Sequence, residues 1–456
     1  MQIPKQLIEQ YNVPAPRYTS YPTVPMWDKS GLNVSTWKAQ LKQVFDQSNE
    51  KEGISLYVHL PYCESLCTYC ACNTRITKNH GVEGGYIRSL LAEWATYRKL
   101  MEAQPQIAEL HLGGGTPTFF APENLHALIR GLLEGCRLHP EAVLSFEGHP
   151  NNTTAAHLQT LYDLGFRRVS YGVQDLNRKV QVTINRLQPL ENVQRAVREA
   201  RAIGYESVNM DLIYGLPFQT PESVTGTIQE VLRMRPDRIA YYSYAHVPWK
   251  RPGQRAYTEE DLPTGEMKRA LYEQGKAALV NAGYEEVGMD HFALPGDALS
   301  RDYRLKRLHR NFMGYTTSHT QLLIGLGASA ISDANGTYAQ NEKSVEAYRA
   351  QVEEGQLALC NGHLATAEDQ IIRQWMLDII CRAELDWRAQ RHLVSLNMLI
   401  ELHRMQSEGL IHLYEQGLRV TDLGMVFIRN ICMVFDKRMQ DNSEGINSRP
   451  AFSSAV

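Results

Sequence analysis

The segment CESLCTYCACN, residues 63–73, contains four of the chain's 8 cysteines. Cys63, Cys67 and Cys70 follow a C-x3-C-x2-C spacing, so their thiolates can converge on one soft metal centre. Cys72 lies so close to Cys70 in the sequence that the short tether would strain a regular four-point cage. A [4Fe–4S] cluster held by three cysteines, with one iron left open, therefore fits the spacing better than a tetrahedral zinc site.

Zinc is the main alternative for this segment. A structural zinc site usually draws two pairs of ligands from separate segments of the chain. The other cysteines occur singly, at Cys136, Cys360, Cys381 and Cys432, so no matching second pair is visible. A zinc-stabilised scaffold without enzyme activity stays open from the residues alone.

Bulk composition describes an ordinary globular protein of more than one domain. The chain has 456 residues, 43% of them hydrophobic and 21% charged, with a net charge of −3 and a pI near 6.6. This balance argues against a nucleic-acid binder, which is usually basic. The N-terminus lacks the apolar stretch of a signal peptide, and the run at 321–332 is too short to span a membrane. We therefore expect a cytoplasmic protein, where clustered cysteines indicate metal or redox chemistry.

Six segments have the apolar character of buried parallel strands, and helical patterns lie between them. The strands are expected at 54–61, 109–115, 144–150, 168–174, 207–217 and 238–248. This alternation predicts an α/β fold with a parallel sheet, either open or curled into a barrel. The strand ends carry the cysteines, the GGGTP loop (113–117), Glu147, Gln174, Asp211, Ala245 and His246. Because parallel sheets bind ligands at the carboxyl ends of their strands, we expect one shared site there.

The polar residues at these strand ends have both a structural and a chemical interpretation. The glycines of the GGGTP loop permit a close approach of the backbone to a ligand. Glu147 and Asp211 could cap helices, or they could bind ribose hydroxyls and cofactor amines. Gln174 and Arg186 could serve a cofactor, Arg186 through a charge-assisted contact to its carboxylate.

Two histidines and the C-terminal region have simpler interpretations. His59 and His111 lie within expected strands and are predicted to line the barrel or its core, not to bind a metal. We divide the chain into an N-terminal arm (1–50), a catalytic domain with a mixed extension (51–365) and a mainly helical C-terminal domain (366–456). The segment LRVTDLGMVFIRNI, residues 418–431, predicts a small hairpin followed by a helix.

The cysteine spacing after a first strand resembles the radical S-adenosylmethionine (SAM) superfamily, in which an aromatic residue, here Tyr69, typically precedes the third cysteine. Longer motifs spread from residue 16 to 433 resemble the oxygen-independent coproporphyrinogen III oxidases (coproporphyrinogen dehydrogenases). These motifs are PRYTSYPT, GGGTPT, YGVQDLN, MDLIYGLPFQTPES, GMDHFA, LHRNFMGYTT and RNICM. The resemblance implies a partial (β/α)6 barrel with a flanking extension and a mainly helical C-terminal domain.

The same resemblance implies a set of cofactor residues. Cys63, Cys67 and Cys70 would hold the [4Fe–4S] cluster, whose open iron binds the amino and carboxylate groups of SAM. Two SAM molecules are expected, since the family binds a second one nearby. Contacts to SAM would fall on Tyr57, Tyr69, Gly114, Gly115, Thr116, Glu147, Gln174, Arg186, Asp211, Ala245 and Ile331. Cys72 would be a bystander to the cluster.

The implied reaction converts two propionates of coproporphyrinogen III to vinyl groups, in haem biosynthesis, by means of a 5′-deoxyadenosyl radical. A reducing donor such as a flavodoxin or ferredoxin would supply electrons. Arg17, Lys306 and Arg310 are candidate anchors for the carboxylates of the substrate. One departure stands out, because well-known members read Glu-x-Asp-Pro-Arg after the third strand, whereas this chain reads EGHPNN (147–152). A haem chaperone and a radical SAM haem-modifying methyltransferase are therefore alternatives.

Overall fold

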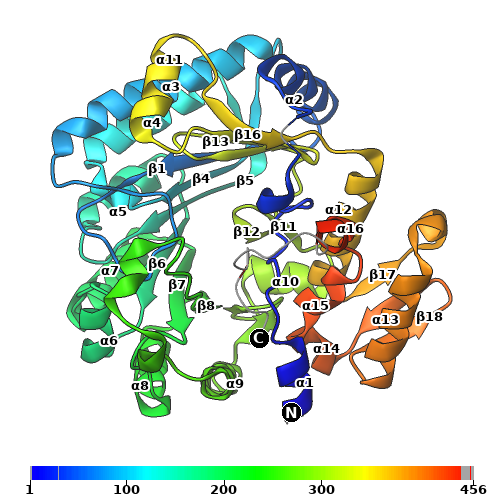
Figure 1. The fold of residues 1–456 in the computed structure, drawn as a ribbon. Helices are drawn as coiled ribbons and strands as arrows, with labels where there is room; N and C mark the ends of the chain where they lie inside the picture. Colours follow the sequence, from blue (N-terminus) through cyan, green and yellow to red (C-terminus); the bar gives the residue numbers. More distant parts are fainter. Residues whose placement is uncertain (1–2, 29, 443–451, 453–456) are drawn as a thin grey trace.

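The computed structural model describes residues 3–28, 30–442 and 452. Its central feature is a sheet of 12 strands, part of which is curled around a lumen (Figure 1). The six expected strands are parallel neighbours in chain order: β1 (Ile54–Leu60), β4 (Gln106–Gly114), β5 (Arg137–Gly148), β6 (Arg168–Gln174), β7 (Ser207–Tyr214) and β8 (Arg238–Ser243). The α/β barrel architecture expected from the sequence is therefore confirmed.

Helices cover the outer face of these strands, because their apolar residues recur at helical spacing. In α7 (Leu190–Ile203), for example, Val193, Ala196, Val197 and Ala200 are buried against the sheet. The other covering helices are α3 (Glu83–Leu100), α4 (Pro122–Leu133), α5 (Ala155–Asp163) and α8 (Pro221–Met234), with the short α6 (Arg178–Thr183) between β6 and α7.

Each barrel strand presents alternate residues to the helices and to the lumen. In β6, Val169, Tyr171 and Val173 belong to the buried core. Arg168, Ser170, Gly172 and Gln174 alternate with them and line cavities of the lumen. The lumen face of a single strand therefore carries polar side chains from its first residue to its last.

The sheet extends beyond the six expected strands at both edges. On one edge, β13 (Leu322–Leu326) pairs parallel with β1, followed by antiparallel β14 (Ile331–Ala334), β15 (Thr337–Asn341) and β16 (Leu359–His363). On the other edge, β10 (His291–Ala293) and β9 (Glu285–Val287) follow β8. The remaining elements of this region are α9 (Gly265–Asn281), α10 (Ala298–Arg304), α11 (Val345–Glu353), the hairpin β11 (His309–Asn311) and β12 (Gly314–Thr316), and the short pair β2 (Tyr62–Cys63) and β3 (Arg75–Ile76).

A second hydrophobic core unites the C-terminal elements with the N-terminal arm, which lies between them and the barrel in Figure 1. Tyr11, Tyr18 and Tyr21 of the arm are buried in this core. The C-terminal elements are α12 (Ala367–Arg382), β17 (Glu384–Asp386), α13 (Leu396–Ser407), β18 (Ile411–Tyr414), β19 (Gly417–Val420), α14 (Asp422–Val426), α15 (Ile428–Met433) and α16 (Lys437–Asn442). The arm contains α1 (Lys5–Tyr11) and leads to α2 (Val34–Ser48). The prediction for residues 418–431 was only partly right: the segment holds the second strand of the hairpin, β19, followed by α14 and α15, whereas the first strand, β18, precedes it.

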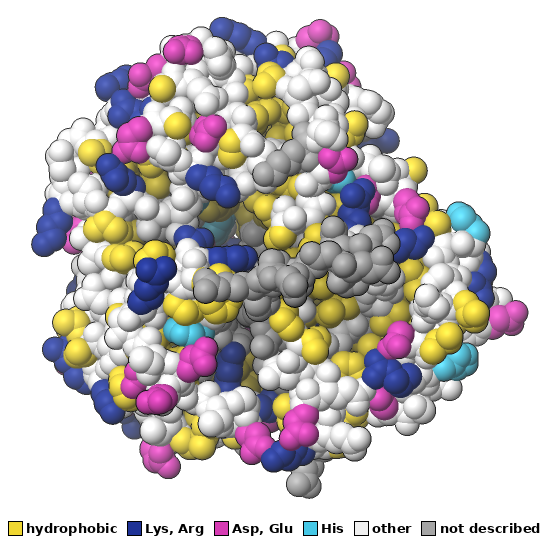
Figure 2. All heavy atoms as spheres, in the orientation of Figure 1, with side chains coloured by type: hydrophobic (Ala, Val, Ile, Leu, Met, Phe, Trp, Pro, Cys, Tyr) yellow, Lys and Arg dark blue, Asp and Glu magenta, His cyan; other side chains and the backbone are white. Residues whose placement is uncertain are grey.

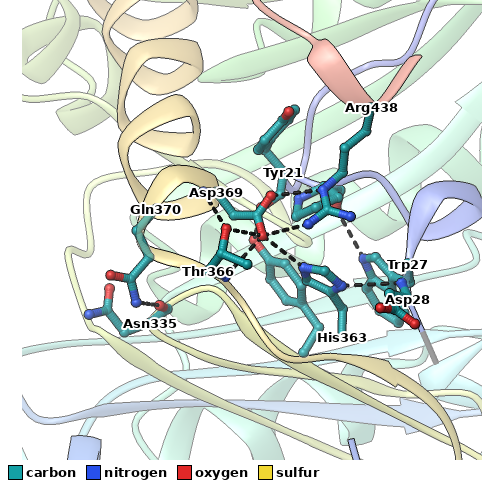
Figure 3. Close-up of polar contacts among 11 residues, drawn as sticks. Tyr21, Trp27, Asp28, Asn335, His363, Thr366, Asp369, Gln370 and Arg438 are labelled. Carbon is teal, nitrogen blue, oxygen red and sulfur yellow. Dashed lines mark hydrogen bonds and ion pairs between the residues drawn. The ribbon is translucent and has the colours of Figure 1, made fainter. Parts of the chain in front are cut away.

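A buried polar network fastens the arm to the C-terminal region (Figure 3). Asp369, at the start of α12, accepts two hydrogen bonds of 2.8 Å from the Arg438 guanidinium. His363 Nε2 lies 3.2 Å from Asp369, and His363 Nδ1 accepts a 3.2 Å hydrogen bond from the backbone N–H of Asp28. Three segments far apart in the sequence are thus joined through one carboxylate.

Within the described part of the chain, no helix is long and apolar enough to cross a membrane. The face shown in Figure 2 carries Lys and Arg side chains interspersed with Asp and Glu. This mixture agrees with the near-neutral net charge.

Candidate active site

A cavity of about 430 Å³ lies at the carboxyl ends of the barrel strands, where the sequence predicted a shared site. The three cysteines of the motif line it together with most of the residues expected to bind SAM. These are Cys63, Cys67, Cys70, Tyr69, Gly114, Gly115, Thr116, Glu147, Gln174, Arg186 and Asp211. The structure thus brings together residues from five strands or their following loops.

Tyr57, Ala245 and Ile331 do not line this cavity. Tyr57 lies on β1 and donates its hydroxyl proton to His59 Nδ1 at 3.1 Å. Ile331 starts β14 and contacts Gly325, the residue of β13 that pairs with Tyr57. Ala245 follows β8 in the loop that supports the cysteine segment. All three lie outside the lining of this cavity.

The cysteine loop is held in place by two segments distant in sequence. On one side, the Thr68 N–H donates to Ile184 O at 2.9 Å and the Asn185 amide donates to Leu66 O at 2.8 Å. On the other side, buried Gln254 donates to the carbonyls of Tyr69 (3.2 Å) and Ala245 (3.1 Å). These bonds fix the backbone of an irregular loop that has little regular structure of its own.

The three cysteines of the motif line the same cavity. Among the described residues, no three His, Cys, Asp or Glu side chains are close enough to hold one metal ion. A single zinc ion needs such convergence, whereas the ligands of a [4Fe–4S] cluster bind separate irons and lie further apart. Three cysteines that line one open cavity match the donor set of a [4Fe–4S] cluster with one open iron.

The electrostatic surroundings of the three thiols differ. A hydrogen bond from the Cys72 thiol, aided by the charge of Arg186, lowers the pKa of Cys70 to about 6. Burial raises the pKa of Cys63 to about 11. The thiolate is the form that binds a metal. Cys70 is therefore ready to act as a ligand at neutral pH, whereas the thiol of Cys63 would ionise only with the positive charge of iron beside it.

Arg186 is the cationic side chain of this cavity. Its guanidinium donates to Gly172 O and lies 3.5 Å from Cys67 Sγ through Nη1. Its Nε is buried and has no hydrogen-bond partner. An unsatisfied buried donor of a charged group is costly, so this atom fits a carboxylate supplied by a ligand.

The GGGTP loop approaches the cysteine segment so closely that side chains are excluded. A Cβ on Gly115 would lie 2.6 Å from Pro61 O, and one on Gly114, whose φ is +115°, would lie 2.8 Å from His59 Nδ1. The Gly115 N–H donates to Leu60 O at 2.8 Å, and Thr116 Oγ1 lies 3.3 Å from Cys63 Sγ. The loop therefore forms a smooth backbone wall beside the first cysteine.

Two carboxylates face the lumen below this wall. Burial and the neighbouring charge of Glu147 raise the pKa of Asp211 to about 7, although Asn209 donates to it at 2.7 Å and Ser170 at 3.2 Å. Glu147 lies 3.5 Å from His111 Nε2. A carboxyl that titrates near neutrality can donate or accept hydrogen bonds to hydroxyl and amino groups of a cofactor.

The two barrel histidines have the structural roles expected of them. His59 is buried and its Nε2 donates to Asn73 O at 2.8 Å, which leaves Nδ1 to accept from Tyr57. His111 Nδ1 pairs with the hydroxyl of Ser145 at 2.8 Å inside the lumen. Both are satisfied by protein groups.

Comparisons with known proteins agree with this geometry. Residues 57–231 match the family model for the radical SAM superfamily. The chain is 37% identical to the oxygen-independent coproporphyrinogen III oxidases of Pseudomonas aeruginosa (94% of this chain, 95% of the relative) and Escherichia coli K12 (96% of each). Its structure matches that of the coproporphyrinogen III oxidase HemN from Escherichia coli, described as a radical SAM enzyme, with a TM-score of 0.88, 36% identity, and 96% and 99% of the two chains covered.

The chain belongs to the oxygen-independent coproporphyrinogen III oxidase family. In this member of the family, the unusual EGHPNN segment forms part of the cofactor cavity, since His149 and Asn151 both line it. Burial, together with the charge of Arg186, holds the pKa of His149 well below its usual range, so the imidazole is neutral. Asn151 donates to Leu187 O at 2.9 Å. The departure from the family pattern therefore changes one wall of the cavity and leaves Glu147 in place.

The expected substrate anchors have different surroundings from one another. Lys306 forms an ion pair of 2.6 Å with Glu384 at the surface. Arg17 pairs with Asp290. Arg310 is buried over the ring of Tyr315, at 4.5 Å, and its Nε and Nη1 have no partner. The charges of Lys306 and Arg17 are each compensated by a carboxylate, so Arg310, whose Nε and Nη1 have no partner, fits the anchor role best.

Sequence reasoning missed the residues that hold the cysteine loop. Gln254 and Asn185 contribute no recognisable motif, and Gln254 lies in a loop more than 180 positions from the cysteines. Only the chain fold brings them to Tyr69 and Leu66, so no local pattern could have revealed them.

Proposed function

We propose that this chain catalyses the oxygen-independent oxidative decarboxylation of coproporphyrinogen III to protoporphyrinogen IX in haem biosynthesis. Similarity to coproporphyrinogen III oxidases over nearly the full chain supports this reaction. The observation that carries the proposal is that the cysteine motif, Arg186 and the two lumen carboxylates line one cavity that opens onto the barrel interior.

In this proposal Cys63, Cys67 and Cys70 hold a [4Fe–4S] cluster, and the other cavity residues hold SAM. When bound, these groups supply a one-electron reductive cleavage that yields a 5′-deoxyadenosyl radical. Arg186 binds the carboxylate of SAM, Asp211 and Glu147 bind its hydroxyl or amino groups, and the glycine loop admits its methionine end. Tyr57, Ala245 and Ile331 would add further contacts to SAM, and a second SAM is expected nearby.

For each propionate, one hydrogen atom leaves the β-carbon, the carboxylate leaves as CO2, and one electron passes to an acceptor, which gives a vinyl group. The chain's role is to orient the propionate and to keep water out of the lumen. A flavodoxin or ferredoxin would supply the reducing electron, and the protein would act in the cytoplasm.

The proposal is tested with the reconstituted full chain under anaerobic conditions, supplied with SAM, a reductant and coproporphyrinogen III. We expect protoporphyrinogen IX, with two CO2 released per molecule. A parallel reaction with haem separates the alternatives, because consumption of haem without decarboxylation of coproporphyrinogen would favour the haem-modifying branch and contradict the proposal.

A further inference from the structure

A second, smaller cavity of about 130 Å³, called the floor cavity below, lies in the lumen beneath the 430 Å³ cavity that holds the cysteine motif. The two cavities adjoin at Glu147 and Asp211, which line both. On β6, Gly172 lines the upper cavity and Arg168 the lower one. A strand rise of roughly 3.3 Å per residue places Arg168 about 13 Å deeper along the strand.

Arg168 has no protein partner for its charge. Among the described residues, no hydrogen bond or ion pair to its side chain is present, although it lines the floor cavity. Burial and the like charge of Arg238 lower its pKa to about 9, so it stays protonated at neutral pH. Arg168 is half-buried, and a guanidinium partly removed from water without a counter-ion is costly, so proteins normally pair such a group.

The two carboxylates whose negative charges act on Arg168, Asp297 and Glu109, are hydrogen-bonded to other groups. Asp297 accepts from Arg238 Nε at 2.7 Å, from the Leu299 N–H at 2.7 Å and from the Ser207 hydroxyl at 3.2 Å. Glu109 accepts from the hydroxyls of Thr316 (2.9 Å) and Ser55 (3.1 Å). The anion that would balance Arg168 must therefore come from outside the chain.

We propose that Arg168 binds a carboxylate of the substrate, holding one propionate arm in the floor cavity while another propionate lies at the cofactor level. This inference rests on the proposed function and adds a substrate-binding residue to it. The cavity has the volume of about four water molecules, at roughly 30 Å³ each, which suits a short carboxylate arm and excludes a tetrapyrrole ring. The planar guanidinium matches a carboxylate in a two-point contact.

Binding measurements on the anaerobically reconstituted full chain test this role. The probes are coproporphyrin III, which carries four carboxylates, and its tetramethyl ester, which carries none. For Arg168→Gln we expect the Kd of coproporphyrin III to rise about 10- to 100-fold, the range for losing hydrogen bonds to a charged group. The affinity for the ester and the affinity for SAM should not change. An unchanged Kd for coproporphyrin III would overturn the inference, and a loss confined to SAM would assign Arg168 to the carboxylate of the cofactor instead.

The adjacent Arg167→Gln variant is the matched control. Arg167 faces away from the lumen, lies over the ring of Tyr162 at 3.8 Å and donates to Tyr162 O at 2.7 Å. It should lose stability but keep its affinity for coproporphyrin III. Arg168→Gln should instead keep or raise the thermal midpoint of the ligand-free chain, because it removes a half-buried charge that has no counter-ion. A lower midpoint with unchanged affinity would show a structural role and refute substrate binding.

Turnover separates this inference from the proposed function. If the wild-type chain decarboxylates coproporphyrinogen III, Arg168→Gln should raise KM at least 10-fold, and Arg168→Lys should restore part of that loss. Wild-type turnover with an unchanged KM in Arg168→Gln would refute the inference alone. Absence of turnover by the wild type would refute the proposed function, while the Kd values would still decide whether Arg168 binds carboxylates.

Discussion

At the scale of single residues, the site contains side chains whose hydrogen bonding or ionisation suits them to bind a cofactor. Arg186 offers a buried Nε without a partner, and the Cys70 thiol ionises near neutrality. These properties depend on burial and on neighbours from other strands. The sequence could therefore indicate which residue types serve the chemistry, but not the pKa or the hydrogen-bond partners of each side chain. The cysteine spacing could place three thiols beside one cavity because it depends only on local chain geometry.

Arg186→Gln should weaken SAM binding about 10-fold or more, because the carboxylate of SAM would lose a charge-assisted hydrogen bond. Equilibrium dialysis with SAM measures this, and iron analysis should show that the cluster is retained. Arg198→Gln, an exposed position on α7, is the control and should bind SAM as the wild type does. Equal SAM affinity in Arg186→Gln would remove Arg186 from the cofactor site.

Cys72→Ala should retain a full [4Fe–4S] complement, because the three ligands Cys63, Cys67 and Cys70 suffice for a cluster with one open iron. Cys70→Ala should lose it. Iron and sulfide content after anaerobic reconstitution, with the visible absorbance of the cluster, distinguishes the two. Loss of the cluster in Cys72→Ala would disprove the three-ligand assignment.

At the scale of elements, the six barrel strands and their helices were predictable because apolar strands and amphipathic helices leave strong local patterns. The edge strands β13–β16 and β9–β10 were not predicted. Their strands are short, with β9 and β10 spanning three residues each, and they join the sheet through pairing that no local pattern encodes. Gln254 and Asn185, which hold the cysteine loop, were missed for the same reason, because they reach it from positions far away in the sequence.

Gln254→Ala should make the cysteine loop less stable, because the carbonyls of Tyr69 and Ala245 and the N–H of Val247 would lose their partner. Each unsatisfied group costs roughly 1–3 kcal/mol when buried. We expect faster loss of iron to a chelator and a lower thermal midpoint. Gln229→Ala, at an exposed site on α8, is the control, and equal rates of iron loss in both variants would contradict this support role.

At the scale of the whole molecule, the N-terminal arm and the C-terminal region share a core and are joined through Asp369. Burial alone would raise the pKa of Asp369, but hydrogen bonds from His363 and Arg438 outweigh it and hold the pKa below its ordinary 3.8. The ionised carboxylate therefore stabilises the fold above pH 3.8, and this contribution is lost as the pH falls from there through the folded-state pKa.

Asp369→Asn should lower the free energy of unfolding by about 3 kcal/mol, because it removes the charge of a buried carboxylate that accepts hydrogen bonds from Arg438 and His363. Denaturant unfolding at neutral pH measures the loss, and the difference from wild type should shrink at pH values below 3.8. Asp378→Asn, which changes a pair with Arg382 within α12 only, is the control and should cost much less. Equal losses in the two variants would contradict the joining role of Asp369.

The central claim is that this chain directs hydrogen abstraction to the propionate side chains of coproporphyrinogen III. The most direct measurement uses substrate deuterated at the β-carbons of its propionates, with mass spectrometry of the 5′-deoxyadenosine formed. The account predicts deuterium in 5′-deoxyadenosine together with the loss of one β-deuterium for each vinyl group formed. Unlabelled 5′-deoxyadenosine, with all the deuterium retained in the porphyrinogen, would contradict it.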